Sequence, residues 1–151
     1  MKTPLISNTT NGFTFIEIAI VVALTSLLLI VIIPLALQFF KTQNVTDTTT
    51  TLLSSLRDAH SMAVSQKNNS SFGVKFLSSS YVVFQGSSYT SRTQSEDTVI
   101  PVPTNTTISG MSEIVFTKRT GIPNITGVIL VQSGSKNLSI SINTQGIIEM
   151  L

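Results

Sequence analysis

Residues Gly12 to Leu37 read GFTFIEIAIVVALTSLLLIVIIPLAL, and this stretch decides how the rest of the chain is organised. From Ile18 to Leu37 there are twenty consecutive residues without a charge, interrupted only by two hydroxyl residues and by Pro34. A helix rises about 1.5 Å per residue, so this run is roughly 30 Å long, which matches the hydrocarbon core of a bilayer. The stretch therefore predicts one membrane-spanning helix.

Two other interpretations of the apolar run are weaker. A secretory signal peptide has a shorter apolar core, of about 7 to 15 residues, and ends in a small-x-small cleavage site, which is absent after Leu37. A buried core helix would need a large soluble domain around it, and the remainder of this 151-residue chain is too small. Pro34 removes one backbone hydrogen bond, which predicts a bend in the helix and not a break.

Glu17 lies at the threshold of this run, where a carboxylate is costly unless it has a role. As an isolated residue it would be interpreted as an acid in the first helical turn, which stabilises the helix dipole. The block around it, Gly12-Phe13-Thr14-Phe15-Ile16-Glu17, follows a short polar leader and precedes the apolar run. This arrangement resembles the processing site of type IV pilins and pseudopilins.

The resemblance implies specific roles for four residues. A prepilin peptidase would cut between Gly12 and Phe13 and methylate the new amino terminus of Phe13. Glu17 would then neutralise the amine of an adjacent subunit in a filament, turning two buried charges into a pair and fixing axial register. Pro34 stands at a distance from the cut where pilins of this family often carry a proline. Lys2 is the single basic residue of the leader, whereas family leaders are usually richer in Lys and Arg.

Beyond the apolar run, the residues Val45, Leu52, Leu56, Ala59 and Ala63 predict that the helix continues with one apolar face. The run VTDTTTT, Val45 to Thr51, is rich in β-branched residues and predicts local fraying or unwinding. The sequence QKNNSS, residues 66–71, is expected to end the helix.

The remaining residues predict a β-rich head. Phe72, Val74 and Phe76 alternate with other residues and are followed by a serine-rich turn and YVVF, which indicates a hairpin. Ser87 to Thr98 is expected to be an irregular, exposed and mobile loop, after which two prolines stiffen the chain. Further strands are expected at residues 113–117, 127–131, 138–142 and 146–150.

We therefore expect an α+β fold, in which a long N-terminal helix, membrane-spanning in its first half and amphipathic in its second, packs on a mostly antiparallel β head. The expected parts are a leader at 1–12, a membrane or filament-core helix at 13–40, an amphipathic helix and linker at 41–71, and a globular head at 72–151. The order of LRDAHSMAVSQKN, VFTKRTG and ISINTQGIIEM is similar to that in H-type minor pseudopilins and related minor pilins.

Enzymatic chemistry is not indicated. The chain has no cysteine, which excludes disulfides and thiolate sites. His60 lies beside Asp58 and Ser61, but residues one or two apart on a helix point to different faces, so a packing histidine is the better interpretation. The acids Glu96, Asp97, Glu113 and Glu149 are too dispersed for a metal cluster, and GVILVQSGSK lacks the spacing of a phosphate-binding loop. We expect no cofactor and no catalytic residue.

The sequence thus predicts a structural filament subunit, a minor or tip pilin or a type II secretion pseudopilin. Its expected partners are prepilin peptidase, other pilin or pseudopilin subunits, the inner-membrane assembly platform and membrane lipid. The precursor is expected to cross the cytoplasmic membrane once with its head outside, and the mature subunit to join a cell-surface or periplasmic filament.

Two alternatives remain open, a minor pilin that binds DNA for uptake and a membrane-anchored adhesin that never polymerises. DNA binding needs a clustered basic surface, but only Lys118 and Arg119 adjoin in the head, so we expect no nucleic-acid partner unless folding gathers Lys75, Arg92 and Lys136 around them. A plain anchor would have no use for Gly12 or Glu17.

Overall fold

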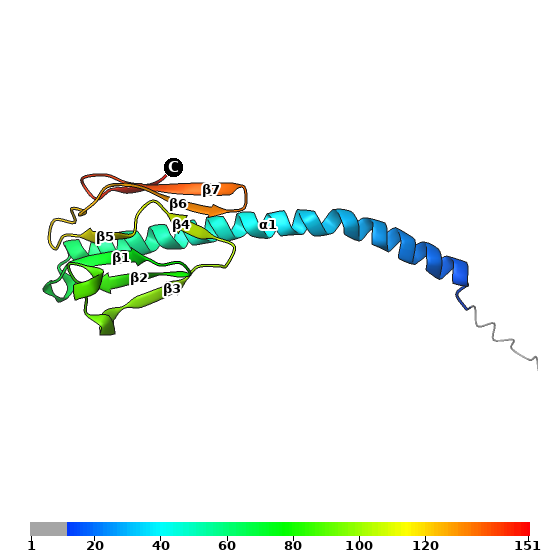
Figure 1. Ribbon diagram of the computed structural model, residues 1–151, viewed down its shortest axis with the longest axis horizontal. Coiled ribbons are helices and arrows are strands. Elements are labelled where there is room, and N and C mark those ends of the chain that lie inside the picture. The colour runs from blue at the N-terminus through cyan, green and yellow to red at the C-terminus, as the bar shows by residue number, and fades with distance from the viewer. Residues whose placement is uncertain (1–11) are drawn as a thin grey trace, which may run out of the picture. The chain divides into compact units, whose positions relative to one another are not determined.

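The computed structural model describes residues 12–151, and it shows the predicted α+β layout of one long helix packed on antiparallel sheets (Figure 1). The contacts divide the chain into two compact units, of which one ends at Gln38 and the other runs from Phe39 to Leu151. The second half of the helix therefore belongs to the same compact unit as the strands.

The helix α1 (Phe15–Val64) is continuous over 50 residues and passes through Pro34 without a break. Its apolar face in the second unit is the predicted one, because Val45, Leu52, Leu56, Ala59 and Ala63 are all fully buried. These side chains form the centre of the core of that unit.

The predicted unwinding between Val45 and Thr51 is wrong. Burial of Val45 and Thr49 against the head holds this part of α1 helical, and such tertiary packing commonly outweighs weak helix propensity. The threonine hydroxyls also find partners inside the helix, where they donate to the carbonyl four residues earlier. The donor–acceptor distances are 3.1 Å for Thr46, 2.7 Å for Thr49, 2.7 Å for Thr50 and 2.8 Å for Thr51.

The helix ends where the sequence predicted. Gln66, Asn68 and Asn69 have positive φ angles of 56°, 52° and 54°, which turn the chain out of the helix, and Asn tolerates this conformation better than most residues. A short 3₁₀ turn, η1 (Lys67–Asn69), leads into the first strand. The backbone N–H of Arg119 donates to the Ala63 carbonyl at 2.9 Å and so satisfies one of the last carbonyls of α1.

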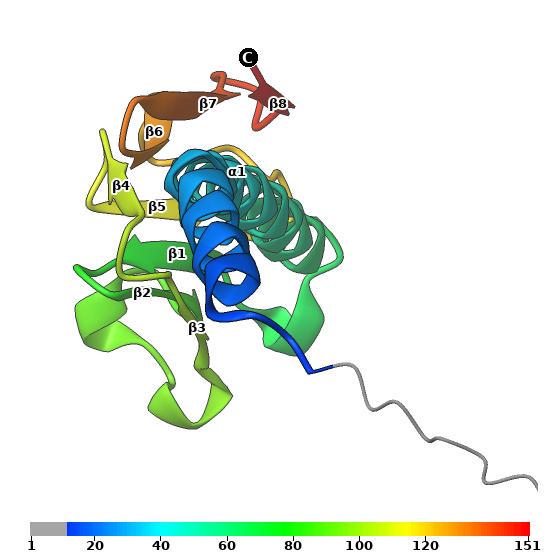
Figure 2. The same ribbon diagram turned by 90° about the vertical axis from the view of Figure 1, so that its right-hand side faces the viewer.

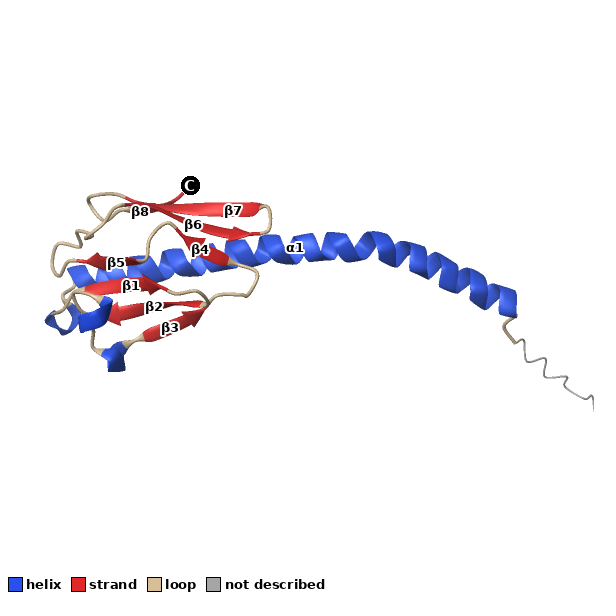
Figure 3. Ribbon diagram, in the orientation of Figure 1, coloured by secondary structure: helices blue, strands red, loops and turns tan. Residues whose placement is uncertain are grey.

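Two antiparallel four-stranded sheets form the head (Figure 3). Sheet A has the order β3-β2-β1-β5 and consists of β1 (Phe72–Phe76), β2 (Ser80–Gln85), β3 (Thr98–Pro101) and β5 (Glu113–Phe116). Sheet B has the order β4-β6-β7-β8 and consists of β4 (Thr107–Ser109), β6 (Gly127–Ser133), β7 (Lys136–Ile142) and β8 (Ile148–Met150). The second half of α1 lies between the two sheets (Figure 2), and its buried side chains belong to one core cluster with side chains of both sheets.

Strands β3 and β4 are additions to the predicted set. The apolar pair of β3, Val99 and Ile100, is followed by Pro101, which indicated a stiff loop. A proline is compatible with β3 because this strand lies at the edge of sheet A, where one side needs no ladder hydrogen bonds. Strand β4 has three residues and leaves no periodic pattern to detect.

The loop between β2 and β3 is more ordered than predicted. It contains two 3₁₀ turns, η2 (Tyr89–Ser91) and η3 (Gln94–Glu96), which are drawn as short helices in Figure 3. Tyr89 packs edge-on against Phe84 at 5.7 Å between ring centroids, and the Arg92 guanidinium lies 3.8 Å from the centre of the Tyr89 ring. Arg92 Nε also pairs with Asp97 Oδ2 at 2.7 Å.

This loop explains why β1 and β2 are buried on both faces, which a simple alternation does not predict. Phe84 lies on the face of sheet A away from α1, next to Gly73 on β1. A Cβ atom on Gly73 would lie 2.6 Å from Phe84 Cζ and 2.6 Å from the Ile114 carbonyl oxygen. Only glycine therefore leaves room for the aromatic ring at this position.

Candidate functional site

The predicted cleavage junction lies in an exposed, non-helical segment just before α1. Gly12, Phe13 and Thr14 are all exposed, and Phe13 has 80% of its surface accessible. A Cβ atom on Gly12 would meet nothing within 4 Å among the described residues. The peptide bond between Gly12 and Phe13 is thus reachable by another protein. The rest of the predicted leader, residues 1–11, lies outside the described residues.

Glu17 takes part in a reciprocal cap at the start of α1. The Thr14 N–H donates to Glu17 Oε2 at 3.4 Å, and the Glu17 N–H donates to Thr14 Oγ1 at 3.3 Å. This is the capping box, in which Thr and a Glu three residues later satisfy two otherwise unpaired donors. The second carboxylate oxygen, Oε1, makes no hydrogen bond to the described residues. The geometry therefore shows a local role for Glu17, and it leaves acceptor capacity for a further partner.

The apolar segment that follows is exposed along its whole length, including Pro34. By length and composition alone, α1 is long and apolar enough to cross a membrane. Its two hydroxyl residues are satisfied internally, since Thr25 Oγ1 donates to the Val21 carbonyl at 2.9 Å and Ser26 Oγ donates to the Val22 carbonyl at 2.7 Å. No protein core covers these side chains in a single copy of the described chain.

His60 is a packing residue, as the sequence indicated. Its ring stands edge-on to Phe116 at 5.3 Å between centroids, at the contact between α1 and β5. Glycines approach it closely, and a Cβ atom on Gly146 would lie 2.9 Å from His60 Nε2. Within the described residues no group of three or more His, Cys, Asp or Glu is placed to hold a metal ion.

The basic residues of the head have separate surroundings. Lys118 Nζ donates to Asn69 Oδ1 at 3.0 Å, Lys75 pairs with Glu113 at 3.8 Å, and Arg92 pairs with Asp97. Lys136 begins β7 in sheet B, whereas Lys75 lies on β1 in sheet A. Lys75 and Arg92 do meet at the Tyr89 ring, but each faces a carboxylate as well.

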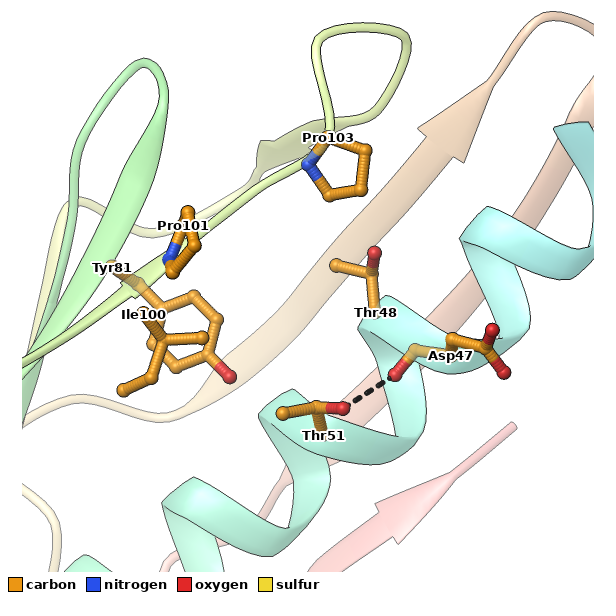
Figure 4. Close-up of a pocket in the computed structure, with 7 residues that line it drawn as sticks. All are labelled: Asp47, Thr48, Thr51, Tyr81, Ile100, Pro101 and Pro103. Carbon is orange, nitrogen blue, oxygen red and sulfur yellow. Dashed lines mark hydrogen bonds between the residues drawn. The ribbon is translucent and has the colours of Figure 1, made fainter.

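A groove beside α1 is the feature that the sequence did not predict. Two hollows of about 190 and 210 Å³ lie between α1 and the edge strand β3, and Ile100 lines both. The first hollow is shown in Figure 4 and is lined by Asp47, Thr48, Thr51, Tyr81, Ile100, Pro101 and Pro103. The second is lined by Ser55, Asp58, Met62, Val83, Thr98 and Ile100. We call the two together the α1–β3 groove.

Tyr81 lines the first hollow and connects strand β2 to α1. Its hydroxyl lies 3.3 Å from Ser55 Oγ on α1, at the junction of the two hollows. Burial raises the pKa of the Tyr81 phenol above its ordinary value of 10.0, and the Ser55 hydrogen bond opposes this shift. The helix spacing of Thr51, Ser55, Asp58 and Met62 is visible in the sequence, but the groove could not be found without predicting β3.

Comparison with protein-family models, with curated proteins and with solved structures found no match to this chain.

Proposed function

We propose that this chain is a structural subunit of a type IV pilin-like filament, a minor pilin or a type II secretion pseudopilin, processed by a prepilin peptidase. The observation that carries the proposal is the junction itself. A glycine-phenylalanine bond in an exposed segment stands directly before a helix whose first turn holds a carboxylate and whose next residues are apolar and exposed.

Cleavage between Gly12 and Phe13 would place a new positively charged amine one residue before the capping box. The bonds between Thr14 and Glu17 do not involve residues 1–12, so the cap would survive the cut. Glu17 Oε1, which has no hydrogen-bond partner among the described residues, would accept from the amine of an adjacent subunit. Such a pair is favourable in an apolar helix bundle because either charge alone would be buried without a partner.

The exposed apolar segment supports polymerisation because it needs a covering that one copy does not supply. In the precursor that covering would be the lipid of the cytoplasmic membrane, crossed once with the head outside. In the filament it would be the same segments of other subunits, which pack by dispersion contacts and charge pairing. The partners in this pathway are the peptidase, the inner-membrane assembly platform and the other subunits.

Processing is tested with Gly12→Val in full-length protein from the native host. We expect mass spectrometry to find wild-type protein beginning at Phe13 with a methylated amine, and the variant to keep residues 1–12. Because a Cβ atom at Gly12 would meet nothing within 4 Å among residues 12–151, a loss of cleavage would indicate impaired recognition by the peptidase and not misfolding. Ala23→Val, inside the apolar helix, is the matched control and should be cut normally. A mature wild-type protein that still carries its leader would refute the proposal.

A further inference from the structure

The α1–β3 groove has an acidic rim over a mainly apolar floor. Asp47 and Asp58 are both exposed on α1 and line its two hollows, while Tyr81, Val83 and Ile100 form apolar surface within it. Neither hollow is lined by a lysine or an arginine. No ion pair involving Asp47 or Asp58 occurs among the described residues. An occupant that combines apolar side chains with positive charge would complement this surface.

One exposed segment of the same head has that combination. The loop after β5, Lys118 to Ile125, carries two basic residues and two isoleucines, with Ile122 and Ile125 exposed at 50% and 47%. We call it the basic-apolar loop. This loop therefore offers exposed apolar side chains next to the exposed positive charge of Arg119.

The basic-apolar loop is also held in place before any partner binds. Arg119 has a φ angle of 73° and its N–H donates to the Ala63 carbonyl of α1. Pro123 is buried and bridges to Phe116, and Asn124 Oδ1 accepts from the Val115 N–H at 2.8 Å. A loop fixed by its own backbone loses little conformational entropy on binding, which favours association.

The groove and the loop lie at opposite edges of sheet A. The groove borders β3, and the loop follows β5, and these are the two outer strands in the order β3-β2-β1-β5. One copy therefore presents the groove at one edge and the loop at the other. A contact between two different surfaces of identical molecules leaves each end unsatisfied, so it can repeat without closing.

We propose that the α1–β3 groove of one head binds the basic-apolar loop of a second copy of this chain. Ile122 and Ile125 cover the apolar floor, and Lys118 and Arg119 meet the rim of Asp47 and Asp58. The inference rests on the proposed filament function and requires that copies of this chain be neighbours in the filament, because the hollows are small and the contact needs the high local concentration that polymerised helices supply.

The absence of cysteine allows a direct test by disulfide cross-linking. Full-length Asp58→Cys and Ile122→Cys variants are co-expressed in the native host, and filaments are isolated and oxidised. We expect a disulfide-linked dimer from the mixed pair and a ladder of multimers when both changes are in one chain. Asp58→Cys with Glu149→Cys is the control, since Glu149 is exposed on β8 in sheet B, and it should give no dimer.

The outcomes separate this inference from the filament proposal. If both cysteine variants enter filaments normally but the mixed pair gives no dimer, the docking inference is overturned and the filament proposal stands. A disulfide from Asp58→Cys to a different protein would also overturn it, because another subunit would then fill the groove. If no variant and no wild-type protein enters a filament, the filament proposal itself fails.

A charge exchange tests the same contact without a cross-link. Asp58→Lys should lower filament incorporation several-fold, because it places a positive charge in the groove against the basic loop. Arg119→Glu should lower it likewise, because it places a negative charge against the acidic rim. Combining both changes in one chain should restore most of the incorporation, since every groove then meets an oppositely charged loop. Defects that add with no recovery would contradict the proposed pairing.

Discussion

Glu17 shows how one residue can satisfy a local rule and still be available for assembly. Its carboxylate closes a capping box with Thr14 in the first turn of α1. The assembly role is a separate prediction, because it needs the negative charge and not only an acceptor oxygen. The two roles can be divided by substitution.

Glu17→Gln keeps an acceptor for the Thr14 N–H but removes the charge, whereas Glu17→Ala removes both. We expect both variants to insert in the membrane and to enter filaments poorly, as measured by immunoblotting of sheared filaments against membranes. Removing a charge makes insertion easier, so the loss can only arise in assembly. Thr14→Ala, which weakens the cap and keeps the charge, should assemble normally. Normal incorporation of Glu17→Gln would assign the residue to capping alone.

Tyr81 predicts a dependence of head stability on alkaline pH. Its pKa in the folded head is raised by burial, so between the unfolded pKa of about 10 and the folded value the unfolded chain binds fewer protons. The free energy of unfolding must therefore fall as the pH rises through that window. Urea titrations of residues 39–151 at pH 9 to 11 should show a steeper loss in wild-type than in Tyr81→Phe. Equal slopes would contradict a buried, neutral phenol.

At the scale of elements, α1 shows which parts of the fold could be predicted from sequence. The apolar stripe from Val45 to Ala63 has helical spacing, and every one of its residues is buried as expected. Thr46 to Thr51 misled the prediction, because propensity describes an isolated helix and the burial of Thr49 is a tertiary effect. The long periodic stripe was informative, whereas the β-branched run VTDTTTT was not.

Some strands could likewise be predicted from the sequence and others could not. The alternation in β1 and the apolar runs of β6 and β7 were sufficient to predict those strands, whereas β3 depends on pairing with β2 and carries Pro101. The α1–β3 groove was missed together with β3. The junction at Gly12 and Phe13 is different, since it is contiguous in sequence and needs no folding to be noticed.

Leu56→Ala tests the contribution of α1 to the core of the head. Leu56 is fully buried among the core cluster, so truncation should lower the free energy of unfolding of residues 39–151 by about 2 to 5 kcal/mol. Thr50→Ala, at an exposed position on the same helix, is the matched control and should change stability little. Chemical denaturation followed by circular dichroism measures both. A small effect of Leu56→Ala would show that the helix is not an essential part of this core.

At the scale of the whole molecule, the division at Gln38 predicts that the head folds alone. A fragment of residues 39–151 keeps the buried stripe of α1 together with both sheets. It should be soluble and monomeric, with a circular dichroism spectrum of mixed helix and strand, because the contact proposed for the groove is too small to hold two free heads together. A fragment of residues 72–151 lacks the helix and should not fold. A folded 72–151 fragment would contradict the shared core.

The threonines of α1 that donate within the helix bear on what happens when the medium around the helix changes. The exposed residues Thr46, Thr50 and Thr51 donate their hydroxyl protons to the helix's own carbonyls. A hydroxyl that already donates within the helix keeps that hydrogen bond when another subunit replaces the water beside it, so its burial leaves no donor unpaired. These three hydroxyls therefore add little to the energetic cost when another subunit replaces water against this face of the helix.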